Sequence, residues 1–380
     1  MQSLKSNALE PDLSDVQERG VGGAVRRLAR MVPSYGVVLL TVGLIVLFSL
    51  LLPQTFPTWT NARLILSNQA VTALLALAVM IPMVAGKIDI SVGYGVVLFE
   101  ILGVSLQTQN HLPWPLVIVV VVILGAALGV VNALLVELAQ IDAFIATLGT
   151  GTVVYAVALW YTGGQQVTGA LPLSFFQMSS GSLLGIPLPA IYVLVLSVVM
   201  WLALDHTPLG RYLYAVGANP EAARLNGVST RRYIVLAFVA SGVITALAGV
   251  VLASKLRIGQ IGVGLDFLLP ALVAAFLGST TIKPGRVNVW GTIVGIVILA
   301  VGISGLQQLG GAFWVEPMFN GVTLLVAIGL AGFAGRKRGA VKRLPPPAPL
   351  INPQFESSLQ TELPVPVPPL PGMSGKGEPQ

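Results

Sequence analysis

The sequence predicts an all-α integral membrane protein with about ten transmembrane helices, some of them short or broken. Two observations support this prediction: 55% of the 380 residues are hydrophobic, and only 9% are charged. A soluble domain usually has about 25% charged residues, so this chain has too few charges to cover a surface that faces water. Because a helix needs about 20 apolar residues to cross a bilayer, the apolar residues suffice for roughly ten such helices.

Ten apolar runs follow a polar N-terminal arm, which is predicted to cover residues 1–32. The first run is longer than the core of about 7–15 residues in a cleavable signal peptide, which indicates a retained span. The third and eighth runs are short and interrupted by Gly or Pro. Such spans are tolerated where protein or water surrounds them, which points to a transport path. The ten runs together form a transmembrane domain over residues 33–335. They lie at 35–52, 64–85, 93–106, 115–136, 143–161, 187–204, 233–253, 268–280, 288–308 and 315–334.

The distribution of Lys and Arg predicts the orientation of the chain. With a cytoplasmic N-terminus, 18 of the 21 basic residues fall on the inside, and only Arg63, Lys255 and Arg257 fall outside. Cytoplasmic loops of membrane proteins have such an excess of basic residues. We therefore expect an even number of spans and cytoplasmic N- and C-termini, and the net charge of +6 does not indicate a nucleic-acid partner.

The last 45 residues differ in composition from the rest of the chain. Residues 336–380 begin with a basic cluster and continue as a Pro-rich segment with little apolar periodicity. This composition is typical of a disordered, partly polyproline tail, predicted here on the cytoplasmic side. A role as a ligand for another protein is the alternative to a plain solvated tail.

The sequence also excludes several kinds of chemistry. The chain has no cysteine, which rules out disulfides and thiolate catalysis. Neither of its two histidines, His111 and His206, has a second ligand at a spacing typical of metal sites. No phosphate-binding G-x-x-x-x-G-K-[ST] loop is present. We expect no metal, no cofactor bound by this chain and no enzymatic activity of its own.

A short helix is predicted within the inside loop between the sixth and seventh runs, over residues 219–227. Asn219 suits the N-cap, and Pro220 suits the first helical position because its missing N–H has no intrahelical partner there. Glu221 and Arg224 match the helix dipole, and Gly227 provides a left-handed stop. Isolated helices of this length are marginal in water. The helix therefore either docks against a partner or packs as an ordinary loop helix on the protein itself.

The same loop resembles a known family. Glu221-Ala222-Ala223 followed by Gly227 resembles the EAA-x3-G coupling loop of ABC importer permeases, and Gly210–Gly227 is similar to the longer signature of the ribose/xylose-type sugar permeases. Two further segments, Lys87–Gly93 and Phe144–Gly149, resemble that family's G-x-I-D-L-S-V-G and F-I-V-T-L-G motifs. The chain departs from the family at the usual Gly-Gly-Thr-Ser-like turn, which appears here as Gly278–Gly285. The resemblance covers roughly residues 33–335.

The resemblance implies the transmembrane subunit of an importer in a bacterial inner membrane. A periplasmic binding protein would deliver a monosaccharide or related polyol, and two cytoplasmic ATPase subunits would hold ATP and Mg. This subunit would form a homodimer, and Asn219, Pro220, Glu221, Ala222, Ala223, Arg224 and Gly227 would couple it to the ATPase. The alternative is an ion-coupled secondary transporter of a small polar solute, with Glu100 and Asp89 as its coupling carboxylates.

Polar residues within the apolar runs are candidates for the substrate pathway. Neutral amides and hydroxyls suit the passage of a polyol, although such residues also bond neighbouring helices. Glu100 either accepts hydrogen bonds from sugar hydroxyls or lies near a wet periplasmic mouth of its short span. The candidates are Asn68, Gln69, Glu100, Asn132, Thr147 and Asn320.

Two further groups of residues have predicted roles. Asp89, with Ser91 and Gly93, is assigned to a structural turn that caps the next helix, because an uncharged sugar needs no fixed carboxylate; substrate contact is the alternative. Lys255 and Arg257 depart from the charge bias of the outer loops. They are candidates for docking acidic residues of the binding protein, or else for contact with lipid headgroups.

Overall fold

The computed structural model describes residues 21–340, with the side chains of residues 36–326 and 329. Most of the predicted N-terminal arm and nearly all of the tail lie outside the described residues. The chain divides into two units, residues 1–335 and 336–380, and the fold described below is that of the first unit.

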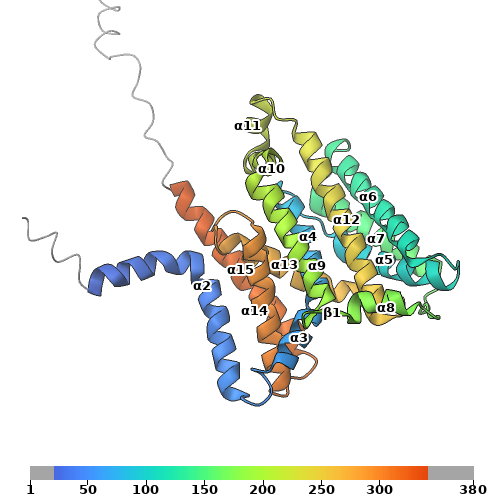
Figure 1. The fold of residues 1–380 in the computed structure, drawn as a ribbon. Coiled ribbons are helices and arrows are strands. Elements are labelled where there is room, and N and C mark those ends of the chain that lie inside the picture. The colour runs from blue at the N-terminus through green and yellow to red at the C-terminus, as the bar shows by residue number, and fades with distance from the viewer. Residues whose placement is uncertain (1–20, 341–380) are drawn as a thin grey trace, which may run out of the picture. The chain divides into compact units, whose positions relative to one another are not determined.

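The described residues are almost entirely helical, with one two-stranded hairpin (Figure 1). The predicted all-α fold class is confirmed. The elements are α2 (Val21–Leu51), α3 (Trp59–Asn68), α4 (Ala70–Val84), α5 (Ser91–Thr108), α6 (Trp114–Glu137), α7 (Ala143–Thr162), α8 (Leu173–Ser180), β1 (Ser182–Leu183), β2 (Ile186–Pro187), α9 (Leu188–Trp201), the π-helical turn η1 (Leu202–His206), α10 (Pro208–Ala218), α11 (Pro220–Leu225), α12 (Thr230–Leu256), α13 (Gly264–Thr280), α14 (Val289–Gln308) and α15 (Val315–Ala340).

Among the described residues, six helices are long and apolar enough to cross a membrane, and the bent pair α3–α4 raises the number to seven. Three shorter apolar helices accompany them, at Gly36–Leu51, Gly264–Thr280 and Val315–Val326. Each of the ten predicted apolar runs overlaps one of these segments. The protein is therefore a multi-pass membrane protein.

The second predicted run, 64–85, is not one continuous helix. α3 and α4 meet at Gln69 with a bend of 44°. A break in a membrane helix leaves backbone groups that need partners from elsewhere in the protein. Lys255 of α12 provides one, since its Nζ donates to the Ser67 carbonyl at 3.1 Å and to Asn68 Oδ1 at 3.0 Å. This contact is remote in the sequence, so the apolar pattern could not reveal the break.

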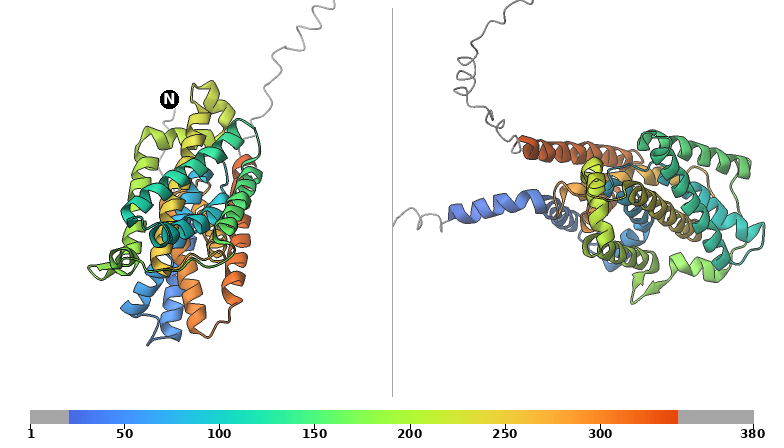
Figure 2. Two further views of the ribbon diagram at one scale, coloured as in Figure 1. Left: turned by 90° about the vertical axis from the view of Figure 1, so that its right-hand side faces the viewer. Right: turned by 90° about the horizontal axis from the view of Figure 1, so that it is seen from above.

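The core of the bundle is built around α4 and α12. Nearly every residue of α4 is buried, as expected for a helix that is apolar on all sides. α12 packs against α4, α5 and α6 (Figures 1 and 2). A Cβ at Gly129 of α6 would lie 2.3 Å from the Phe238 carbonyl oxygen, so only glycine permits this contact. Small residues of this kind let membrane helices approach closely.

The two ends of the bundle carry different elements. α10 and α11 lie at one end, while α3, α8 and the β1–β2 hairpin lie at the other (Figure 1). The segment that contains α8 packs on the last turns of α12: Ser254 Oγ donates to the Phe175 carbonyl at 2.7 Å, and Val167 pairs with Gly259. A functional site at one end of the bundle is therefore separated from the opposite end by the length of the helices.

Candidate functional site

A cavity of about 960 Å³ lies among α3, α4, α12, α13, α14 and α15, at the end of the bundle opposite α11. Amide side chains dominate its polar lining, and Thr72 and Ser304 add hydroxyls. Amides offer both donors and acceptors, which suits a solute with several hydroxyl groups. The lining amides are Asn61, Asn68, Gln69, Gln307, Gln308 and Asn320.

Three of the six residues assigned to the pathway line this cavity: Asn68, Gln69 and Asn320. Asn320 is only 3% exposed, and its Oδ1 has no hydrogen-bond partner among the described residues. Gln308 Nε2 donates to Asn61 Oδ1 at 2.9 Å, while its own Oε1 also lacks a partner there. Amides whose acceptor oxygens are buried and unused are suited to binding a hydroxyl solute.

The cavity also contains charged groups of both signs, Lys255, Asp266 and Glu316. Lys255 is held at the α3–α4 break by Ser67 and Asn68, and Glu316 Oε2 accepts from Gln307 Nε2 at 3.3 Å. Asn61, Asp266, Gln307, Gln308 and Glu316 were not among the predicted pathway residues. They lie near helix ends, where polar residues in a sequence are more simply interpreted as interfacial.

Arg257 lies beside this end of α12 but not in the cavity lining. It is exposed, has a left-handed backbone conformation with φ of 62°, and places its Cζ 3.4 Å from the centroid of the Phe176 ring. Lys255 and Arg257 thus have different surroundings. The docking role predicted for both stays a prediction.

At the other end, α11 has the capped form that the sequence predicts. Asn219 Oδ1 accepts from the Ala222 N–H at 3.0 Å, and Gly227 has a positive φ of 78°. Ala223 is buried against the protein, whereas Leu225 is 80% exposed. The helix therefore fixes one face to the bundle and presents an apolar side chain on the other. Glu221 and Arg224 form an exposed ion pair of 2.8 Å.

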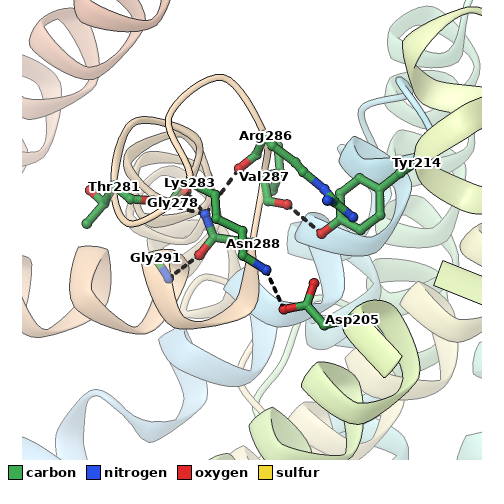
Figure 3. Close-up of polar contacts among 9 residues, drawn as sticks. All are labelled: Asp205, Tyr214, Gly278, Thr281, Lys283, Arg286, Val287, Asn288 and Gly291. Carbon is green, nitrogen blue, oxygen red and sulfur yellow. Dashed lines mark hydrogen bonds and ion pairs between the residues drawn. The ribbon is translucent and has the colours of Figure 1, made fainter. Parts of the chain in front are cut away.

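The helix before α11 contacts the turn between α13 and α14 (Figure 3). The Tyr214 hydroxyl donates to the Val287 carbonyl at 2.7 Å, and the Arg286 guanidinium carbon lies 3.4 Å from the centroid of the Tyr214 ring. Lys283 Nζ lies 2.6 Å from Asp205 Oδ2. Burial raises the pKa of the Tyr214 phenol; Arg286 opposes this shift and Asp205 adds to it. The phenol is therefore a protonated donor near neutral pH.

Asn288 organises this turn from within. Its Oδ1 accepts from the Gly291 N–H at 2.8 Å and caps α14. Its Nδ2 lies within hydrogen-bonding distance of three carbonyls, those of Gly278 at 2.8 Å, Thr281 at 3.0 Å and Arg286 at 3.1 Å (Figure 3). One buried side chain thus joins the end of α13, the turn and the start of α14.

The comparisons with known proteins agree with this architecture. The family model described as "Branched-chain amino acid transport system / permease component" matches residues 61–331, a range that includes the whole cavity lining and α11. The chain belongs to this permease family. It is a transport subunit and not an enzyme.

Several relatives of the permease are similar over most of its length. The ribose import permease protein RbsC of Haemophilus influenzae is 31% identical over 298 residues, which cover 78% of this chain and 92% of that protein. The D-allose transport system permease protein AlsC of Escherichia coli is 27% identical over 296 residues, with coverage of 78% and 90%. The autoinducer 2 import system permease protein LsrD of Escherichia coli is 30% identical over 260 residues, with coverage of 67% and 78%. No solved structure matches the chain significantly.

In this permease, Asp89 belongs to a buried polar turn between α4 and α5. Its Oδ1 accepts from the backbone N–H of Ser91 at 3.0 Å and from Ser91 Oγ at 2.5 Å, and its Oδ2 accepts from Ser241 Oγ at 2.8 Å. Both carboxylate oxygens are thus bonded to the protein, but Ile90 and not the predicted Asp89 occupies the N-cap of α5, because the helix begins at Ser91. The structural role of this turn stays a prediction. Gly93 follows in α5, where a Cβ would lie 2.6 Å from Leu268 Cβ of α13.

Asn132 and Thr147 of the permease join the same turn and do not line the cavity. Asn132 Nδ2 donates to Ser91 Oγ at 2.7 Å and its Oδ1 accepts from Thr150 Oγ1 at 2.5 Å. Thr147 Oγ1 accepts from the Ile90 N–H at 3.0 Å. Both are fully buried, and their contacts correspond to the alternative role of bonding neighbouring helices.

Glu100 is also fully buried and lies outside the cavity lining. Its Oε1 accepts from the backbone N–H of Gln260 at 3.2 Å, and its Oε2 has no partner among the described residues. Gln260 lies in the segment between α12 and α13, just before the cavity residue Val263. Glu100 therefore binds the segment that precedes α13, and this hydrogen bond does not reach a residue of the cavity lining. Among the described residues, no cluster of three or more His, Cys, Asp or Glu side chains could hold a metal ion.

Proposed function

We propose that the protein is the transmembrane permease subunit of an ABC importer that translocates a monosaccharide or related polyol across a bacterial inner membrane. The observation that carries the proposal is the position of α11, a capped helix with an exposed Leu225, at the end of the bundle opposite an amide-lined cavity. This arrangement supports a solute path on one side and a docking helix for an energy-supplying partner on the other.

The cavity supports a neutral, hydroxyl-rich substrate. Its six amides can donate and accept hydrogen bonds without fixing a charge on the solute. The relatives agree, since two of them are named for the import or transport of ribose and D-allose, which are both sugars. Asn68, Gln69 and Asn320 are the pathway residues that we assign to direct solute contact.

Separate cytoplasmic ATPase subunits supply the energy in this proposal, and they hold ATP and Mg. The sequence has no phosphate-binding loop of its own. Leu225 supplies an apolar anchor for the ATPase, while the buried Ala223 fixes α11 to the bundle. The exposed Glu221–Arg224 pair adds little, because surface ion pairs contribute about 0–1 kcal/mol.

The other partners follow from the same proposal. A periplasmic sugar-binding protein delivers the solute to the cavity end, where the exposed Arg257 offers a positive charge for docking. Two copies of this subunit form the membrane unit. The ion-coupled alternative with Asp89 and Glu100 as coupling carboxylates receives less support, because both are buried against the protein and do not line the cavity; the carboxylates that do, Asp266 and Glu316, lie there together with Lys255.

Purification of the tagged chain in mild detergent, with mass spectrometry of the proteins that remain bound, tests the proposal. We expect a stoichiometric ATPase that contains a phosphate-binding loop. Reconstitution in proteoliposomes then separates the two mechanisms: an importer requires ATP, the ATPase and the binding protein for uptake. Uptake by the chain alone under an ion gradient would overturn the proposal in favour of a carrier.

A further inference from the structure

α10 and α11 are directly connected at the end of the bundle. α10 ends at Ala218 and α11 begins at Pro220, with Asn219 as the single residue between them. Asn219 is tied to both helices: its N–H donates to the Ala215 carbonyl at 3.1 Å, and its side chain caps α11. These two bonds connect the start of α11 to the end of α10.

α10 contacts the turn at 281–288 through a hydrogen bond and a cation–π contact, both made by Tyr214. Tyr214 uses its hydroxyl on the Val287 carbonyl and its ring face on Arg286. The Arg286 guanidinium lies over the face of the Tyr214 ring, and the Tyr214 hydroxyl bonds the adjacent residue, Val287. Together these two contacts fix both the distance and the direction between α10 and the turn. The Asp205–Lys283 ion pair reinforces it from η1, which immediately precedes α10 (Figure 3).

The turn joins two helices, α13 and α14, that line the cavity. Asn288 bonds the turn to both α13 and α14, and so connects the position of the turn to these two helices. At their far ends both helices line the cavity, α13 with Asp266 and Phe267, and α14 with Ser304 and Gln308. Rigid helices can carry a displacement over their length, provided that the contacts at their ends are specific.

We infer that Tyr214 and Arg286 are positioning residues that transmit the movement of α11 to α13 and α14, and so link ATP hydrolysis on the partner to a change in the solute cavity. This inference rests on the proposed function. It assigns the transmission of movement to a contact that lies outside the docking helix α11. The two residues touch neither the solute cavity nor the exposed face of α11.

The test uses the full transporter, with permease, ATPase and binding protein reconstituted in proteoliposomes. Tyr214→Phe removes the hydroxyl donor but keeps the ring, and Arg286→Gln removes the cation. For each we expect the ATPase to remain bound, while the number of solute molecules imported per ATP falls at least about fivefold, the lower end of a typical coupling effect. The matched control is Tyr212→Phe, because Tyr212 lies on the same helix, is exposed, and packs on Tyr233 instead of the turn.

Wild-type import per ATP in both Tyr214→Phe and Arg286→Gln would overturn the inference. Failure of the proposed function gives a different result, since the wild-type protein would then bind no ATPase or show no ATP-dependent uptake. If a variant has a lowered melting temperature, the ion pair provides a second test. Lys283→Asp should lower import per ATP, and the added exchange Asp205→Lys should restore it; no restoration in a stable double variant would overturn the inference.

Discussion

Lys255 Nζ lies 3.0 Å from Asn68 Oδ1 and 3.1 Å from the Ser67 carbonyl oxygen, and so joins the end of α12 to the break between α3 and α4. The lysine has two roles. It places a positive charge near the end of α12, and it donates a hydrogen bond to the Ser67 carbonyl at the bend between α3 and α4. It also forms part of the wall of the cavity. Both the shape and the charge of the cavity therefore depend on it.

Lys255→Met should destabilise the permease. The substitution keeps most of the apolar stem but leaves the Ser67 carbonyl without its donor, which should lower the free energy of unfolding by about 1–3 kcal/mol. The measurement is the melting temperature in detergent. Arg257→Gln, two residues along the chain and exposed, is the control; it removes only the cation–π contact with Phe176 and should lower stability by no more than about 0.5–1 kcal/mol. Equal effects of both substitutions would show that Lys255 has no special structural role.

Asn320→Leu should impair transport without unfolding the protein. The substitution removes the buried amide that lines the cavity, and a lost hydrogen bond to a solute should reduce the uptake rate about tenfold. Uptake of radiolabelled sugar at a known amount of transporter measures this effect. Met318→Leu on the same helix, at an exposed position, is the matched control. Unchanged uptake in Asn320→Leu would remove this residue from the pathway.

Glu100 should tolerate exchange for glutamine but not for alanine. Glutamine still offers an oxygen to the Gln260 N–H, whereas alanine leaves this group unpartnered and creates a void. We expect near-normal uptake and melting temperature for Glu100→Gln and a clear loss of both for Glu100→Ala. Equal loss in the two variants would mean that the carboxylate itself is required, as an ion-coupled carrier would demand.

Ala223→Pro should abolish uptake while the chain still inserts into the membrane. Proline removes the bond from the Ala223 N–H to the Asn219 carbonyl, now 3.0 Å, and a proline inside a helix costs about 3 kcal/mol. The shape of α11 is lost, and with it the proposed docking of the ATPase. Uptake, membrane content and bound ATPase are measured on the same preparation. Normal uptake in this variant would contradict the coupling role of α11.

Arg257→Glu should weaken the binding protein's affinity for the permease and reduce the salt dependence of that affinity. Reversal of an exposed charge at an interface acts mainly through electrostatic attraction, which salt screens. Titration of the binding protein at two salt concentrations measures both effects. An affinity equal to that of the wild type would leave Arg257 with only its contact to Phe176.

The sequence predicts best those features that short segments determine by themselves. The apolar runs mark the helices, and Asn219, Pro220 and Gly227 mark the capped helix because each acts on its immediate neighbours. Contacts across long separations are not predictable in this way. Tyr214 meets Val287 at a separation of 73 residues, and Lys255 meets Asn68 at a separation of 187.

The polar residues of the apolar runs illustrate the same division. Asn132 and Asn320 have the same side chain and both lie within apolar runs, yet one bonds Ser91 in a buried network and the other lines the cavity. The direction in which each amide points depends on which helices surround it. A single sequence contains the polar group but not its spatial neighbours, so it is compatible with both roles.

The burial of α4 on nearly all sides has a consequence for the order of assembly. α4 is surrounded by α5, α12, α13 and α14, all of which follow it in the chain. During synthesis it therefore enters the bilayer before its neighbours exist. Its sequence, AVTALLALAVMIPMV, has no charged residue, and lipid tails are as apolar as leucine, so its side chains are compatible with lipid, whereas the break before it gains its Lys255 donor only when α12 is made. Enclosure of α4 is then a late step of biogenesis, and it is complete only after α14 has been inserted.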